Sequence, residues 1–175
     1  MIPLKDSPRA RRFPIVNMAL IILNIYIFLR QFFMPDSELI ALVYTYGLIP
    51  HRFAAALAAG AFPAAIQPLF THQFLHGSWL HVGSNMLYLW VFGDNIEDRL
   101  GHLRYLVFYL LMGLAAGMTQ IVFNLHSPVP VIGASGAVAG ILGAYALICP
   151  HARVLALVPL LFFFTIAEVP AMIFL

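Results

Sequence analysis

The sequence predicts an all-α, polytopic membrane protein, and three observations support this fold class. Of the 175 residues, 62% are hydrophobic and only 9% are charged, and the mean hydropathy is +0.92. A soluble globular domain has roughly 25% charged residues. In addition, long apolar segments alternate with short charged ones, as expected for helices that cross a membrane. The net charge of +2 is too small to indicate nucleic-acid binding.

The first expected span runs from about Pro14 to Met34, long enough for a hydrocarbon core of roughly 30 Å. It follows a basic stretch, residues 1–13, that we expect to be a flexible cytoplasmic tail. The apolar run is too long for a signal peptide and shows no small-residue cleavage site, so we expect a retained helix. Asn17 and Asn24 lie seven residues apart on one helix face and are expected to pack inward.

Residues 35–77 predict a long connection that does not span the membrane. Prolines interrupt it repeatedly, and its apolar pieces are too short to cross a bilayer; the prolines are Pro35, Pro50, Pro63 and Pro68. Apolar but interrupted sequence is typical of a segment that lies at the membrane interface. We therefore expect an interfacial connection after the first helix.

Four more helices complete the expected domain, which comprises residues 14–175. Their predicted limits are Trp79 to Phe92 with Ser78 as N-cap, Tyr105 to Phe123, Ala134 to Ile148, and Val154 to Leu175. The second of the five helices is expected to stop at Gly93, before a charged turn. Glu168 lies in the last apolar run, where an ionisable group is expected to face a cavity or a partner and to have a packing or gating role. The single Cys149 excludes an internal disulfide and is expected to be a buried thiol.

Lysine and arginine counts predict the orientation. With the N-terminus in the cytoplasm, seven of these residues lie inside and two outside; the inner ones are Lys5, Arg9, Arg11, Arg12, Arg99, Arg104 and Arg153, and the outer ones Arg30 and Arg52. The second and fourth helices then begin at the outer face. His81, Asn85 and Ser135 are therefore expected at a similar depth in the membrane.

The stretch Gly133-Ala134-Ser135-Gly136 places a serine between glycines at the start of the fourth helix. Alone, a serine in a membrane helix favours a packing role. Peptide hydrolysis by serine needs a nucleophilic hydroxyl, a base, and donors for the oxyanion. Ser135 supplies the hydroxyl, and its backbone N–H at a helix N-terminus is a suitable oxyanion donor. Gly133 and Gly136 leave room for a substrate backbone.

His81 and Asn85 lie four residues apart, so both project from one face of the second helix. They are plausible side-chain donors to an oxyanion, but spacing alone equally allows a pair that merely joins two helices. A metal site of His72, His76 and His81 is disfavoured, because no carboxylate or cysteine lies near and no HExxH motif occurs. We expect no metal and no cofactor.

The segment from His76 to Asn85, the stretch from Glu97 to Gly101, and the Gly133–Gly136 motif together resemble the rhomboid family of intramembrane serine proteases. The resemblance runs from about residue 13 to the end. It implies a bundle of six helices, with Ser135 as nucleophile and His81, Asn85 and the Ser135 amide as oxyanion hole. The residues with expected structural roles are His76, Glu97, Arg99, Gly101, Gly133, Gly136 and Gly140.

The resemblance also implies that the protein lies in a bacterial cytoplasmic membrane and cleaves single-pass membrane proteins near the outer membrane boundary. The substrate is expected to enter beside the fifth helix. The family's general base is a histidine on a sixth helix, whereas here His151, at the far end of the fourth helix, is the only histidine after Ser135. We therefore expect a truncated sequence whose 175-residue form is inactive. A non-catalytic rhomboid-like binder of transmembrane helices is the alternative. A small transporter is disfavoured because the polar cluster is confined to one side.

Overall fold

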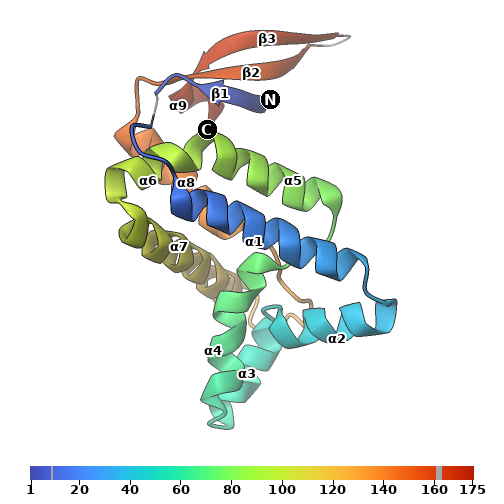
Figure 1. Ribbon diagram of the computed structural model, residues 1–175. Coiled ribbons are helices and arrows are strands. Elements are labelled where there is room, and N and C mark those ends of the chain that lie inside the picture. Colours follow the sequence, from blue (N-terminus) through green and yellow to red (C-terminus); the bar gives the residue numbers. More distant parts are fainter. Residues whose placement is uncertain (9, 161–162) are drawn as a thin grey trace.

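The computed structural model describes residues 1–8, 10–160 and 163–175 and consists mainly of helices, with a small sheet at one end (Figure 1). Arg9, one of the basic residues counted in the tail, lies outside the described residues. The elements in chain order are β1 (Ile2–Asp6), α1 (Ile15–Phe32), α2 (Asp36–Tyr46), α3 (Pro50–Ala58), α4 (Phe62–Thr71), η1 (His72–Phe74), α5 (Trp79–Tyr88), η2 (Leu89–Gly93), α6 (Asp94–Leu100), α7 (His102–Phe123), α8 (Ser135–Ile148), β2 (Arg153–Leu160), β3 (Phe163–Pro170) and α9 (Ala171–Phe174).

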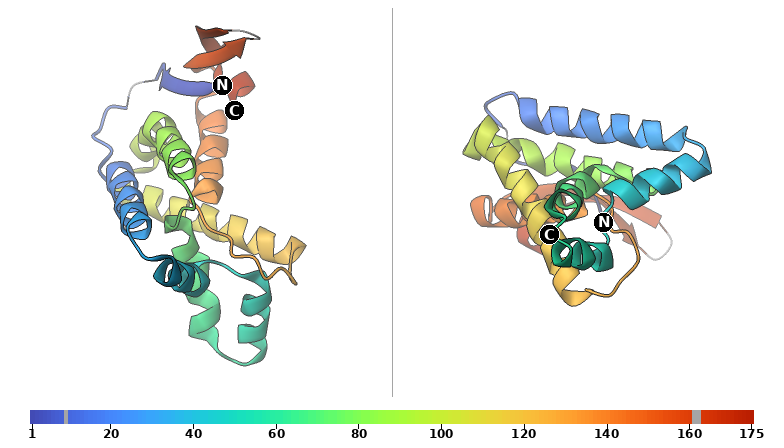
Figure 2. Two further views of the ribbon diagram at one scale, coloured as in Figure 1. Left: turned by 90° about the vertical axis from the view of Figure 1, so that its right-hand side faces the viewer. Right: turned by 90° about the horizontal axis from the view of Figure 1, so that it is seen from below.

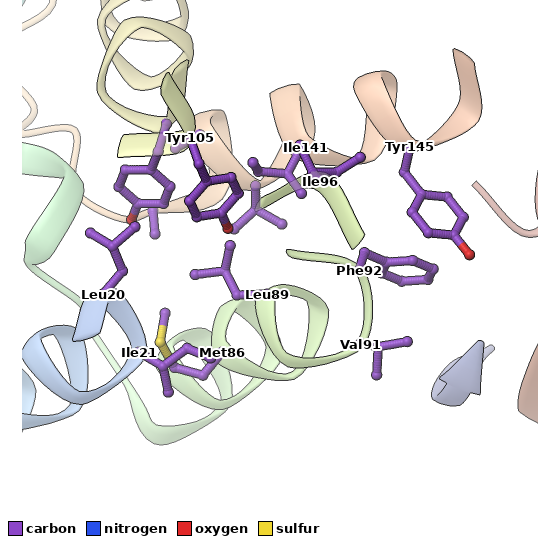
Figure 3. Close-up of a cluster of buried hydrophobic side chains, with 14 of the residues drawn as sticks. Leu20, Ile21, Met86, Leu89, Val91, Phe92, Ile96, Tyr105, Ile141 and Tyr145 are labelled. Carbon is purple, nitrogen blue, oxygen red and sulfur yellow. The ribbon is translucent and has the colours of Figure 1, made fainter. Parts of the chain in front are cut away.

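The predicted helical bundle is confirmed for its first four helices. α1, α7 and α8 begin and end within three residues of their expected limits. Among the described residues, α1 with 18 residues and α7 with 22 are long and apolar enough to cross a membrane, and α8 is a shorter apolar helix. The side chains between these helices form one apolar core, which contains Leu89, Phe92 and Tyr105 (Figure 3).

The second expected helix continues well beyond its predicted end. Gly93 keeps helical angles (φ −68°, ψ −35°), and α5 passes through the π-helical turn η2 into α6 without a break. The helix ends only at Gly101, where φ is +78°. The prediction of a stop at Gly93 was wrong because a polar sequence alone does not end a helix; a residue in the left-handed conformation does.

Asn17 and Asn24 are both buried, as predicted. The π-helical turn shifts the hydrogen-bond register of its backbone, and here the Asn17 side chain donates to the Leu89 carbonyl oxygen at 2.9 Å. The Tyr105 hydroxyl in turn donates to Asn17 Oδ1 at 2.7 Å. Asn17 therefore links α1, η2 and α7 inside the bundle.

Glu97 caps the N-terminus of α1, although it lies 80 residues away in the sequence from Asn17, one of the residues it binds. Its side chain is 2% exposed and accepts hydrogen bonds from the backbone N–H groups of Val16 (2.9 Å) and Asn17 (2.7 Å). His102 Nδ1 also contacts this carboxylate. The first N–H groups of a helix have no partner within the helix, and a negative charge there is favourable. Glu97 therefore caps the start of α1.

The connection between α1 and α5 is interrupted, as expected. It consists of the short helices α2, α3 and α4 and the single turn η1, and prolines lie at or near the start of each of the three α-helices. Proline is favoured at that position because its missing N–H would have no helical partner. α3 and α4 extend from the end of the bundle opposite the sheet (Figures 1 and 2).

The prediction of a fifth helix from Val154 to Leu175 was wrong. Most of this segment forms the antiparallel hairpin β2–β3, in which Arg153 pairs with Pro170 and Leu160 pairs with Phe163. Pro159 lies in the middle of the apolar run, where a helix would lose a hydrogen bond and about 3 kcal/mol. Valine, isoleucine, threonine and phenylalanine, which are frequent here, favour strands. Glu168 accordingly lies on an exposed strand face, 3.6 Å from Arg153, and lines a cavity of about 300 Å³ at the sheet.

The N-terminal segment is part of the same sheet, so the expectation of a flexible tail was wrong for its first six residues. β1 pairs antiparallel with β2, from Ile2 opposite Leu157 to Asp6 opposite Val154. Asp6 also binds the bundle, because its Oδ2 accepts hydrogen bonds from the Tyr145 hydroxyl (2.6 Å) and Asn95 Nδ2 (2.9 Å). The sheet is thereby fixed to the ends of α6 and α8. Nearby Cys149 is free and only half-buried.

Replacing Glu97 by Gln should lower the free energy of unfolding by about 1.5–3 kcal/mol, the range for hydrogen bonds to charged groups. Unfolding in mixed detergent micelles measures this change. Glu168→Gln is the matched control, because its exposed ion pair is worth less than about 1 kcal/mol. Equal losses in the two variants would contradict the capping role of Glu97.

Candidate active site

Ser135 is the first residue of α8 and its side chain is exposed. Two histidines of the segment before α5 bind the backbone directly in front of it. The Gly133 N–H donates to the His72 carbonyl oxygen at 2.9 Å, and the Ala134 N–H donates to His76 Nε2 at 3.4 Å. These bonds fix the entry of the chain into α8 and leave the Ser135 N–H at the free helix terminus.

Gly133 lies directly against the ring of His81. Its φ is +124°, and a Cβ atom added there would lie 2.5 Å from His81 Nε2 and 2.6 Å from Cε1. Only glycine fits, because a side chain would both clash and strain the backbone. The loop that carries Ser135 is therefore in contact with α5 at His81, as the predicted topology required.

His76 and His81 form a compact pair beside this loop. Their ring centroids are 5.0 Å apart at an interplanar angle of 70°. Burial of the ring lowers the pKa of His76 to about 4, and the neighbouring His81 contributes a smaller effect in the same direction. His76, in the loop before α5, is therefore neutral at physiological pH and able to accept the hydrogen bond from Ala134.

Asn85 lies one helical turn after His81 and is buried, with 6% of its surface exposed. Its Nδ2 has no hydrogen-bond partner in the described part of the chain, and neither does His76 Nδ1. An unpaired buried donor costs about 1–3 kcal/mol, so such groups call for an explanation, and a ligand that they bind is one. α5 and α8 are in contact. Asn85 thus offers a free amide donor on the helix that also carries His81.

Small residues allow α7 and α8 to approach closely below Ser135. A Cβ atom on Gly136 would overlap Ala116, and one on Gly140 would overlap Met112. This is the contact typical of small residues between membrane helices. Gly136 and Gly140 are therefore packing residues in this structure. The remaining motif residues lie at the other end of the bundle: Gly101 ends α6, and Arg99 is exposed.

Gln31 is a residue of this region that the sequence reasoning missed. It is buried, and its Oε1 accepts a hydrogen bond from the His76 N–H at 3.1 Å. The signal was present, because Gln31 follows Asn24 by seven residues just as Asn24 follows Asn17. Repetition of polar residues on one helix face indicates a face that packs inward.

His151 and His102 are not part of this cluster. His151 follows the C-terminal end of α8, and the 14 residues of that helix place it about 21 Å from Ser135. His102 contacts Glu97. Within the described residues, no group of three or more histidine, cysteine or carboxylate side chains is placed to hold a metal ion. The groups gathered around the start of α8 are thus a hydroxyl, backbone donors and side-chain donors.

Gly133→Ala should destabilise the protein by about 1–3 kcal/mol more than Gly60→Ala, the usual range for overpacking. Gly60 also has a positive φ, +70°, but no atom within 4 Å of an added Cβ, so Gly60→Ala is a control without a steric contact. Denaturant unfolding of both variants in micelles gives the difference. If the two variants lose the same stability, the contact between Gly133 and His81 is absent.

Comparison with known proteins identifies the family. A family model described as the Rhomboid domain matches residues 63–175, well over half of the chain. The chain is 34% identical over 89 residues to Rhomboid protein 1, mitochondrial, of Saccharomyces cerevisiae (49% of this chain, 26% of that protein). It is 41% identical over 76 residues to Rhomboid protease GluP of Bacillus subtilis (43% of this chain, 14% of that protein).

A third relative is the human Presenilin-associated rhomboid-like protein, mitochondrial, which is 30% identical over 100 residues (56% of this chain, 26% of that protein). The matched segments span between 14% and 26% of these relatives' own lengths. The family match agrees with the helical bundle. The chain belongs to the rhomboid family of membrane proteins.

Proposed function

We propose that this protein is an intramembrane serine endopeptidase with Ser135 as its nucleophile. The observation that carries the proposal is the arrangement at the start of α8. Ser135 stands exposed at a helix N-terminus, and the loop before it rests on His81. One turn along the same helix, Asn85 has a buried amide donor without a partner. These are the nucleophile and the oxyanion donors that acyl transfer requires, and a base is the remaining requirement.

In this reaction the Ser135 hydroxyl oxygen attacks the carbonyl carbon of the scissile peptide bond, and the carbonyl oxygen becomes an oxyanion. The Ser135 N–H, Asn85 Nδ2 and the His81 ring nitrogen that carries a proton donate to that oxygen. Because these donors are held in place before the reaction, each is worth about 10²–10³ in kcat. Gly133 and Gly136 keep the approach to the hydroxyl free of side chains.

We further propose that residues 1–175 alone do not cleave substrate. In the described residues no side chain accepts a hydrogen bond from the Ser135 hydroxyl. A serine without a base to take its proton is a weak nucleophile at neutral pH. The same observation favours the second candidate function, a rhomboid-like protein that binds transmembrane helices without cutting them.

The proposed substrates are single-pass membrane proteins, cut near the outer boundary of a bacterial cytoplasmic membrane with the N-terminus of this chain in the cytoplasm. The long apolar helices α1 and α7 support a membrane location. Lysine and arginine are in excess in the segments on the same side of the membrane as the N-terminus, and this excess supports the orientation. Similarity to the Bacillus subtilis protease supports a bacterial membrane, although mitochondrial relatives are also similar.

The test uses the full-length natural protein that contains residues 1–175, reconstituted in liposomes with a single-pass transmembrane reporter. A fluorophosphonate should label the wild type and Ser37→Ala, whose serine is exposed on α2, but not Ser135→Ala. Reporter cleavage should be abolished in Ser135→Ala and reduced about 10²–10³-fold in Asn85→Ala. Equal labelling of Ser135→Ala would contradict the assignment of the nucleophile.

Two further outcomes separate the candidates. Reporter binding without labelling or cleavage in the full-length protein would favour the non-catalytic binder and overturn the protease. Cleavage of the reporter by residues 1–175 alone, lost in Ser135→Ala, would contradict the proposed inactivity of this segment.

A further inference from the structure

A cavity at the end of the bundle opposite Ser135 has no role in the proposed proteolysis. It has a volume of about 410 Å³ and lies where the N-terminal segment meets α6 and the end of α8; its lining residues are Pro8, Arg11, Arg12, Asn95, Asp98, Arg99 and Cys149. Cys149 directly follows α8, whereas Ser135 begins it. The cavity and the start of α8 are therefore separated by the length of that helix.

The cavity carries uncompensated positive charge. Three of its side chains are arginines and one is a carboxylate, Asp98. Asp98 Oδ1 already accepts a hydrogen bond from the backbone N–H of Arg12 at 3.2 Å. The ion pairs of the described residues, Glu97–His102 and Arg153–Glu168, involve none of the three arginines. The guanidinium groups are exposed and available for an anion from outside.

Guanidinium groups suit one class of anion best. Their planar fork of N–H donors matches the oxygen atoms of phosphate and binds them in pairs. The amide of Asn95 contributes no further free donor, because its Nδ2 already donates to Asp6 and Asp94. Recognition in this cavity therefore depends on the arginines and favours a phosphate group.

A second cavity of about 500 Å³ adjoins the first and shares Pro8, Arg11 and Arg12 with it. Its other parts are lined by apolar side chains, among them Phe13, Trp90 and Val91, and by the charged side chains of Lys5, Asp6 and Asp94. Phe13 is 71% exposed and Trp90 is 59% exposed. Phe13 lies just before α1, and Trp90 lies in η2. Exposed aromatic side chains, tryptophan above all, are typical of the boundary between headgroups and acyl chains.

Arg11 and Arg12 thus line both cavities, and the second cavity adds an apolar wall of Phe13, Trp90 and Val91. Cationic side chains next to an apolar wall fit a ligand with a phosphate head and an apolar body. We propose that these joined cavities bind an anionic phospholipid of the leaflet on the N-terminal side, with its phosphate between Arg11, Arg12 and Arg99. Basic pockets among membrane helices bind anionic headgroups in this way. The glycerol and the first acyl carbons then lie along Phe13 and Trp90.

The test measures lipid binding by native mass spectrometry of the full-length protein in detergent, titrated with phosphatidylglycerol or phosphatidylcholine. Phosphatidylglycerol should bind more tightly, and Arg11→Gln, Arg12→Gln and Arg99→Gln should each weaken it about fivefold. Arg104→Gln removes the same charge from an exposed position on α7 outside the cavity and should have no effect. Arg12→Lys keeps the charge and should retain most of the binding, which separates charge loss from misfolding.

Three results would overturn the proposal. Equal affinity for the two lipids would show that the phosphate site does not discriminate by charge. Equal weakening by Arg104→Gln and Arg12→Gln would show a general charge effect without a site. Displacement of phosphatidylglycerol by inorganic phosphate or glycerol phosphate at the same concentration would assign a soluble phosphate ligand and remove the role of Phe13 and Trp90.

Discussion

The attachment of the start of α8 to the histidine segment is the constraint on which the candidate site depends. The His72 carbonyl and His76 Nε2 hold the backbone of Gly133 and Ala134, and the ring of His81 occupies the space that a Gly133 side chain would need. Each contact acts on backbone in front of Ser135. Helix α8 therefore begins at a fixed place, with its first N–H groups and the serine hydroxyl beside α5.

The two ends of the bundle differ in whether their buried polar groups have hydrogen-bond partners. At the end near the sheet, the Glu97 carboxylate accepts hydrogen bonds from the first N–H groups of α1. The Asn17 side chain donates to a backbone carbonyl of η2 and accepts a hydrogen bond from the Tyr105 hydroxyl. At the end near Ser135, Asn85 Nδ2 and His76 Nδ1 have no partner within the described residues, and Asn24 Oδ1, Gln73 Oε1 and the Tyr109 hydroxyl are unpaired elsewhere in the bundle. Satisfied networks stabilise one arrangement of helices, whereas unpaired donors are kept at a cost in stability. This contrast gives the bundle a structural end and a candidate chemical end.

Hydropathy and residue spacing were sufficient to predict α1, α7 and α8 and the inward face of α1, because these features follow from local composition and from the helical periodicity of the residues. They failed where distant segments decide the outcome. The run 154–175 has the hydropathy of a membrane helix, and its pairing with Ile2–Asp6 leaves no local pattern. The contact of Glu97 with α1 joins residues 80 positions apart. The roles of Ser135, His81 and Asn85 come from their motifs and stay predictions, whereas the close contact of Gly133 with His81 became visible only from the φ of Gly133 and its neighbour.

The central claim is that Ser135 is a nucleophile whose oxyanion is bound by the groups around the start of α8. A structure of the full-length protein after reaction with a serine-directed phosphonate tests it most directly. The account predicts a covalent bond from Ser135 Oγ to phosphorus, with the phosphoryl oxygen about 2.7–3.1 Å from the Ser135 nitrogen, Asn85 Nδ2 and a His81 ring nitrogen. An unmodified Ser135, or a phosphoryl oxygen that points away from His81 and Asn85, would contradict it.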